Sequence, residues 1–255
     1  MGEASAALAR YRELLVWLDR GVFSVQPVSL MSNAGFSELR AGHAAAALKL
    51  AQGERVADER AGNLQTMALA DLLASRAALA LGRPGESSRH LEAAEAYWNT
   101  NAKGNARMLL ESTLHRAELQ LAAGSDLDAR DRAEAALQSL GYPDRMSAAG
   151  LDRVLRLSAR TLLRTGNPAK AVDRASSALE VSKRVARDER KSADVGEAAL
   201  LRAQAYAALD RPVDALADAR LAVEALRNGL GSDHATTSSA EALVATLSST
   251  GKGRR

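Results

Sequence analysis

The sequence predicts an all-α fold, a right-handed α-solenoid of about five antiparallel helix pairs with a capping helix at each end. Apolar residues make up 47% of the 255 residues, but aromatic residues make up only 3%. Alanine therefore supplies much of the apolar content, and the helices must approach one another closely. Runs of β-branched residues are almost absent, which argues against a sheet.

A recurring phrase supports this fold. A helix-compatible run ends in a small or turn residue, and an alanine-rich run follows. The turn residues are Gly42, Gly82, Gly124, Gly166 and Asp210, separated by 40, 42, 42 and 44 residues. Glycine permits the positive φ that ends many helices. Pro84, Pro168 and Pro212 suit the first turn of the next helix. The phrase therefore predicts a helix pair repeated along the chain.

The elements follow in chain order. A first helix is expected at 4–19, followed by an irregular connection through Gln26-Pro27. The pairs are predicted at 28–40 with 43–58, 62–81 with 85–99, 104–123 with 126–140, 147–165 with 168–187, and 192–209 with 212–228. A final helix is predicted at 235–249. We therefore divide the chain into a capping helix with its connection (1–27), a superhelical repeat domain (28–249) and a disordered basic tail (250–255).

Alanine spacing explains how each pair is held together. In the fourth pair, Ala171, Ala175 and Ala178 recur at i, i+4 and i+7. They are expected to face Leu155, Ala159 and Leu162. The third pair would set Leu110, Leu114, Ala117 and Leu121 against Ala129, Ala133 and Ala136, and the fifth Ala203 and Tyr206 against Ala215, Ala219 and Ala222. One pair buries too little surface alone, so successive pairs must stack.

These residues resemble the tetratricopeptide repeat (TPR) family, over about residues 28–249. The matching positions are Ala203, Tyr206, Ala215 and Ala222 in the fifth pair, and Ala159, Leu162, Gly166, Ala171 and Ala178 in the fourth. In the second pair Ser87 stands where the first alanine of the second helix belongs, although Ala94 fits the next position. The period exceeds the usual length of about 34 residues, and so looks like the longer kinesin-light-chain-like variant.

The segment GLGSDHATTSSAEAL at 229–243 is similar to the Leu-Gly-x-Asp-His-Pro-x-Thr sequence that joins repeats in bacterial proteins of this type, with Ala235 in place of the proline. The resemblance implies a bacterial, cytoplasmic protein that binds other proteins, as in regulatory and signalling assemblies. It does not name the partner.

The residues themselves indicate no catalytic chemistry. There is no cysteine, and the four histidines fall in four different repeat units without metal-ligand spacing. Neither a phosphate-binding loop nor a nucleophile elbow is present, so we expect no enzyme activity, cofactor or metal. His115 with Glu111 and Glu118 is interpreted as a surface salt-bridge cluster. The net charge of +3 is too small to indicate nucleic-acid binding. No apolar window is long enough to cross a membrane.

Four arginines form the candidate binding site. Arg153, Arg156, Arg160 and Arg164 are spaced by 3, 4 and 4 residues and share one helical face, away from the predicted pair contact. Arg76 and Arg202 would extend the lining. In the family's arrangement, the first helices line the concave groove. Such a row of guanidinium groups suits an acidic peptide, a C-terminal carboxylate or a phosphorylated segment. The alternative is a solvated face neutralised by Glu111, Glu118 or Glu197.

A second candidate surface lies at the N-terminus, where LLVWL at 14–18 and Phe23 concentrate apolar side chains. We interpret this segment as a cap over the first pair. The alternative is a docking or self-association surface that uses Trp17 and Phe23. The sequence as a whole predicts a non-catalytic protein-interaction scaffold that binds through its groove. Two other classes stay open: a regulator that senses a signalling peptide, and a structural assembly subunit that uses its ends or convex face.

Overall fold

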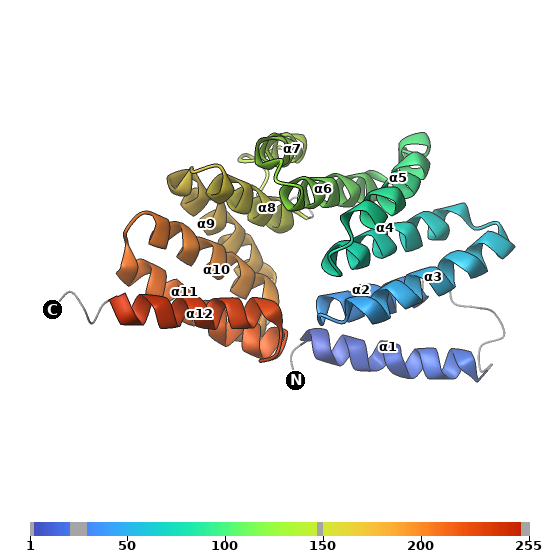
Figure 1. The fold of residues 1–255 in the computed structure, drawn as a ribbon, viewed down its shortest axis with the longest axis horizontal. Helices are drawn as coiled ribbons and strands as arrows, with labels where there is room; N and C mark the ends of the chain where they lie inside the picture. Colours follow the sequence, from blue (N-terminus) through green and yellow to red (C-terminus); the bar gives the residue numbers. More distant parts are fainter. Residues whose placement is uncertain (1–2, 21–29, 147–149, 251–255) are drawn as a thin grey trace. The chain divides into compact units, whose positions relative to one another are not determined.

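The computed structural model describes residues 3–20, 30–146 and 150–250. All the regular secondary structure of these residues is helical (Figure 1). The helices are α1 (Glu3–Asp19), α2 (Leu30–Arg40), α3 (Ala44–Ala61), α4 (Leu64–Ala80), α5 (Pro84–Thr100), α6 (Ala106–Ala122), α7 (Asp126–Ser139), α8 (Leu151–Arg164), α9 (Pro168–Val185), a 3₁₀ turn η1 (Glu189–Lys191), α10 (Ala193–Ala208), α11 (Pro212–Gly229) and α12 (Ala235–Thr250). No strand occurs among these residues. The all-α prediction is confirmed.

Some expectations fall outside the described residues. They are Phe23, the connection through Gln26-Pro27, the predicted helix starts at 28–29 and 147–149, and the tail from 251 onward. Elsewhere the predicted boundaries lie within a few residues of the observed ones. Pro84, Pro168 and Pro212 each begin a helix, as their fixed φ favours.

The chain divides into two compact units. One spans Ala4–Ala123, and the other comprises Gly124–Arg255 together with Met1–Glu3. The boundary falls between α6 and α7, so the predicted third pair is shared between the units. Each of its helices is described within its own unit, and their mutual facing stays a prediction.

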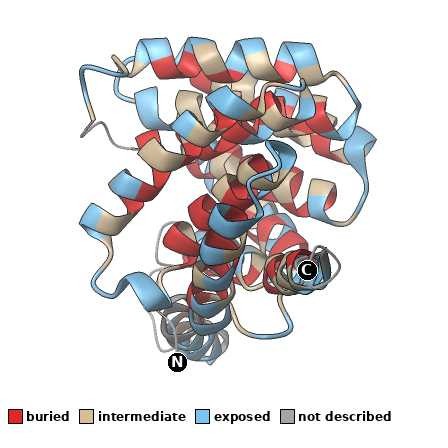
Figure 2. Ribbon diagram, turned by 90° about the vertical axis from the view of Figure 1, so that its left-hand side faces the viewer, coloured by how far each residue is buried: buried red, intermediate tan, exposed pale blue. Residues whose placement is uncertain are grey.

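Within each unit, consecutive helices pack as predicted. In the first, α2 packs on α3 and α4 on α5; in the second, α8 packs on α9 and α10 on α11. Ala159, Ala171, Ala175 and Ala178 are fully buried, and so are Ala203, Ala215, Ala219 and Ala222. Buried residues follow the facing sides of the helices, and exposed residues follow the outer sides (Figure 2). Alanine is therefore the contact residue of the pairs, as its spacing predicts.

One register position holds a small residue on the first helix of each of the five pairs. The positions Gly35, Ser75, Ala117, Ala159 and Ala203 have the same spacing as the turns. At Gly35 a Cβ atom would lie 2.3 Å from Cδ2 of Leu73, so the Leu73 side chain would have to shift to admit alanine. We call this position the close-contact position. Its counterparts on the second helices are Ala47, Ser87, Ala129, Ala171 and Ala215.

Candidate functional site

First helices of successive pairs are neighbours within each unit. In the second unit α8 lies beside α10, and α10 beside α12 (Figure 1). The four arginines of the candidate site all belong to α8. We refer to the side of α8 and α10 that carries Arg156, Arg160 and Glu197 as the first-helix face.

Arg156 is buried in ion pairs within this face and is not open to a ligand. Its guanidinium is buried and contacts three carboxylates: Nη2 lies 3.3 Å from Asp152 Oδ2, Nη1 lies 3.0 Å from Asp194 Oδ1, and Nε lies 3.5 Å from Glu197 Oε2. Burial alone would lower the pKa of Arg156, but the charges of Glu197, Asp194 and Asp152 outweigh it and raise the pKa. The cation stays charged and links α8 to α10.

The remaining arginines of α8 differ from one another. Arg160 is exposed and makes no ion pair with any residue that the structure describes. Arg164 is also exposed, and its Nη2 lies 3.0 Å from Oδ1 of Asp126 at the start of α7. Arg153 is half-buried and has an interaction of its own. The series therefore presents one open guanidinium, Arg160, beside the partly exposed ion pair of Arg164 and Asp126.

Arg76 and Arg202 are held within their units. Arg76 of α4 donates to Glu111 Oε2 of α6 at 2.6 Å, and its guanidinium carbon lies 5.7 Å from the ring centre of Phe36. Arg202 of α10 donates from Nε and Nη2 to the two oxygens of Asp218 at 2.6 and 2.7 Å. This fork raises the pKa of Arg202, in spite of partial burial. A binding role for these two arginines stays a prediction.

The predicted surface cluster around His115 is wrong, because His115 is buried, with only 1% of its surface exposed. Its Nε2 lies 2.9 Å from Ser75 Oγ and 3.3 Å from Ser87 Oγ, and its Nδ1 lies 3.0 Å from Glu118. Ser75 in turn donates to the carbonyl oxygen of Ser87 at 2.6 Å. These serines occupy the close-contact positions of the second pair, where the other pairs have alanine or, at Gly35, glycine. Glu111 pairs with Arg76 of α4.

This network was detectable in the sequence, but only in part. Ser87 departs from the alanine register, and that departure is the signal of a polar pair contact. His115 stands where Leu157 and Leu201 stand in the later pairs, so it is the matching departure on the next first helix. Together the three residues replace an apolar contact by a hydrogen-bonded one.

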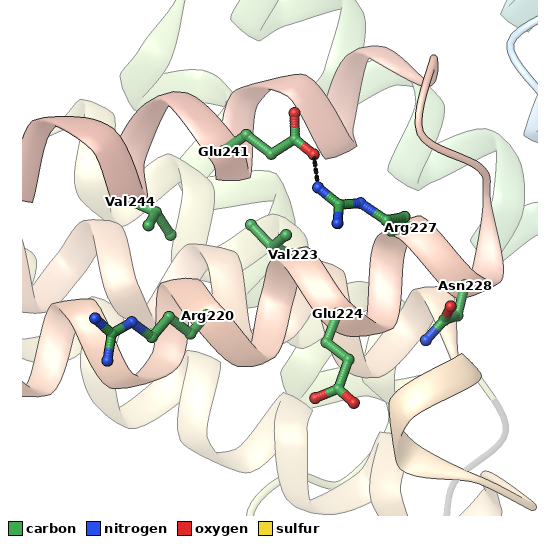
Figure 3. Close-up of a pocket in the computed structure, with 7 residues that line it drawn as sticks. All are labelled: Arg220, Val223, Glu224, Arg227, Asn228, Glu241 and Val244. Carbon is green, nitrogen blue, oxygen red and sulfur yellow. Dashed lines mark hydrogen bonds and ion pairs between the residues drawn. The ribbon is translucent and has the colours of Figure 1, made fainter.

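A groove runs between α11 and α12, with a volume of about 420 Å³ (Figure 3). It is lined by Arg220, Val223, Glu224, Arg227, Asn228, Glu241 and Val244. The two valines lie between the helices, and Arg227 donates to Glu241 across the groove at 2.5 Å. The sequence analysis did not identify this surface.

At the N-terminus, α1 is attached to α2 by an ion pair. Arg12 donates from Nε and Nη2 to the two oxygens of Glu38 at 2.7 and 2.8 Å, and His43 Nδ1 lies 2.7 Å from the same carboxylate. Trp17 is 41% exposed, so part of its ring remains open to solvent. Self-association through Trp17 stays a prediction.

Two negative findings apply to the described part of the chain. Over residues 3–20, 30–146 and 150–250, no group of three or more His, Cys, Asp or Glu side chains is arranged to hold a metal ion. No helix there is both long enough and apolar enough to span a bilayer.

No family model matches the sequence, and no curated protein matches it. Among solved structures, BtubC (BKLC) from P. vanneervenii is similar with a TM-score of 0.60 at 15% identity, over 82% of each chain. The TPR2AB domain of yeast Sti1, in a complex with pHSP90, gives a TM-score of 0.39 at 12% identity, over 96% of this chain and 92% of that one. The TPR domain of P58(IPK) gives 0.38 at 17% identity, over 96% and 64%. The first likeness supports a TPR-like helical-repeat fold. The other two scores are too low to indicate a shared arrangement.

Proposed function

We propose that the chain is a non-catalytic interaction scaffold that binds an acidic segment of a partner protein on the first-helix face of α8 and α10. The observation that carries this proposal is the exposed guanidinium of Arg160, which has no ion-pair partner among the described residues. The repeat domain at 28–249 would serve as the scaffold in a bacterial, cytoplasmic regulatory or signalling assembly, in line with the family that the repeats resemble.

The side chains around Arg160 favour an anionic ligand that carries few negative charges. Arg164 lies one helical turn away, on the same side of α8. Its ion pair with Asp126 is partly exposed: 53% of the Arg164 side chain and 25% of the Asp126 side chain are accessible. Arg164 itself is exposed, and ion pairs near the surface contribute only about 0–1 kcal/mol, so a ligand carboxylate or phosphate can compete for its guanidinium. Asp152, Asp194 and Glu197 are occupied by Arg156 and limit the positive charge of the face.

The test uses a displayed library of random peptides, selected on the full chain. We expect enrichment of peptides that contain Asp, Glu or both, because these side chains pair with guanidinium groups. Arg160→Glu should lower the affinity of the selected peptides by about tenfold or more, which corresponds to about 1.4 kcal/mol.

Arg89→Glu is the matched control. Arg89 is an exposed arginine on the outer side of α5, so its reversal makes the same change in net charge. Selected peptides that bind the Arg160→Glu variant as well as the original chain would contradict the proposed site. An equal loss in both variants would show a general charge effect instead and would also contradict it.

A further inference from the structure

The groove between α11 and α12 is lined by residues at which α11 departs from the preceding repeat. By the 44-residue spacing of the fourth and fifth pairs, Val223 corresponds to Leu179 and Arg220 to Ser176. Leu179 is only 4% exposed, whereas Val223 is half-buried and lines the groove. At Arg220, a long cationic side chain stands where α9 has a small hydroxyl. The fifth pair therefore opens a surface at Val223 that the fourth pair closes, and adds a charge one turn away.

The middle of the groove is apolar. Val223 of α11 and Val244 of α12 lie between the two helices, and both are half-buried (Figure 3). Val244 also packs against a buried cluster that includes Ala219 and Leu247. The volume of about 420 Å³ falls within the range of about 300–1,000 Å³ that is usual for small-molecule sites. The groove can therefore take up the apolar part of a small molecule and remove it from water.

Arg220 supplies a charge that the described part of the chain does not balance. Both glutamates that line the groove are already paired: Glu241 accepts from Arg227 at 2.5 Å, and Glu224 Oε1 lies 3.5 Å from Arg190 Nη1. Arg220 is exposed and makes no ion pair with any residue in 3–20, 30–146 or 150–250. A guanidinium group offers a planar pair of donors that matches a carboxylate. The carboxylate that fits Arg220 is therefore one that a ligand brings.

We propose that this groove binds a small aliphatic carboxylic acid, with the carboxylate on Arg220 and the hydrocarbon chain over Val223 and Val244. Arg220 lies at one end of the groove, and the ion pair of Arg227 and Glu241 lies at the other (Figure 3). A chain that carries its charge at one end only matches this order of groups. The methylene stem of Arg220 adds apolar contact beside the charge. The site is distinct from the one proposed at Arg160, because it lies on other helices and requires an apolar group.

Titration of the full chain with sodium octanoate, followed by a two-dimensional proton–nitrogen NMR spectrum, tests the site. We expect saturable shifts of amide signals in α11 and α12, with a dissociation constant on the order of 1 mM for a ligand of this size. Acetate has the carboxylate without the chain, and octylammonium has the chain with the opposite charge. Each should bind at least about tenfold more weakly than octanoate, because each lacks one of the two contacts.

Arg220→Glu reverses the charge at the end of the groove. The variant should bind octanoate at least about tenfold more weakly than the original chain, and should bind octylammonium more tightly than octanoate. Arg89→Glu, at an exposed site of α5, makes the same change in net charge and should leave both affinities unchanged. Arg160→Glu should also leave octanoate binding unchanged, so failure of this site is distinguishable from failure of the site at Arg160. Circular dichroism would verify that the variants are folded.

Three results would overturn the proposal. The first is an absence of octanoate-dependent shifts in α11 and α12 at about 10 mM, a concentration well above the expected dissociation constant. The second is equal octanoate binding by the Arg220→Glu variant and the original chain. The third comes from a short peptide with a free C-terminal leucine, which also joins a carboxylate to an apolar group. If this peptide bound the groove and octanoate did not, the ligand would be the end of a protein chain and not a small acid.

Discussion

Arg156 Nη1 lies 3.0 Å from Oδ1 of Asp194, and this contact joins the first helices of two successive repeats. The same guanidinium also contacts Asp152 and Glu197, so one cation neutralises carboxylates on both α8 and α10. Burial removes water from Arg156 itself, while the three carboxylates remain partly accessible. The arginine therefore contributes to the stacking of repeats more than to the recognition of a ligand.

Replacing Arg156 should weaken the fold. Arg156→Met keeps much of the side-chain volume but leaves three carboxylates without their cation. We expect the free energy of unfolding to fall by about 3 kcal/mol, as when one partner of a buried ion pair is removed. Urea denaturation followed by circular dichroism measures this change. Arg160→Met, at an exposed site, should change it by no more than about 0.5 kcal/mol. Equal effects of the two substitutions would refute the structural role of Arg156.

The hydrogen-bonded network of Ser75, Ser87 and His115 should tolerate substitution only when all three residues are replaced together. Ser75→Ala removes a hydroxyl that contacts both Ser87 and His115, and should cost about 1–3 kcal/mol because buried polar groups lose their partner. Combining Ser75→Ala, Ser87→Ala and His115→Leu should recover most of this loss. By register the combination copies the fourth pair, which has Ala159 and Ala171 at these positions and Leu201 on the next first helix. Thermal unfolding of the single and triple variants measures the recovery. If the triple variant lost as much stability as the sum of the single variants, the three residues would not be coupled.

Glu54 should make stability depend on pH. Burial raises the pKa of Glu54 above its ordinary value of 4.5, although the Ser32 hydroxyl donates to it and lowers the pKa in part. The folded state therefore keeps a proton that the unfolded state has lost. Stability should fall as the pH rises from 4.5 through the folded-state pKa. Glu54→Gln should flatten this fall, which urea unfolding at a series of pH values would detect. An unchanged slope in the variant would contradict the assignment.

Glu38 of the neighbouring helix α2 should give stability the opposite dependence on pH. Its hydrogen bonds from Arg12, and then from His43, lower the pKa of Glu38 below 4.5 despite partial burial. Its contribution to stability should be present above pH 4.5 and be lost as the pH falls through the folded-state pKa. The same pH series on Glu38→Gln should show a smaller loss in acid. A steeper loss in the variant would argue against the Arg12 pairing.

Two helical glycines should respond differently to alanine. At Gly229 a Cβ atom would lie 2.8 Å from the Ala193 backbone nitrogen and 3.0 Å from the Lys191 carbonyl oxygen, so backbone must move. Gly229→Ala should cost about 1–3 kcal/mol. At Gly53 the nearest atom is Met31 Sδ, at 3.5 Å, which is an ordinary contact. Gly53→Ala should therefore stabilise the chain by about 0.5–1 kcal/mol through helix propensity. Thermal melting of both variants compares them.

Periodic features were predictable from the sequence because each has a local cause. The turn residues predicted the boundaries between helices, and the alanine spacing predicted the faces that Ala171 and Ala215 bury. Even Asp210 follows this pattern, since it adopts a positive φ of 53° at the position where the other turns have glycine.

The pairing of polar side chains was not predictable in the same way. Spacing placed Arg156 and Arg160 on one helical face, but it could not show that carboxylates of α10 reach one and not the other. His115 was assigned to the surface because its helical neighbours are acidic. Its burial depends on Ser75 and Ser87, which lie 40 and 28 residues away along the chain. Such long-range partners become visible only when the repeats are stacked.

The polar contact of Ser75, Ser87 and His115 limits how this repeat array can be rearranged. A segment exchange between repeats that moved the second pair without α6 would place serines beside leucine, and would leave two hydroxyl groups without the imidazole. The reverse exchange would bury a histidine against alanine. A rearrangement that keeps this contact must therefore move the second pair and α6 together, although the repeat itself ends one helix earlier.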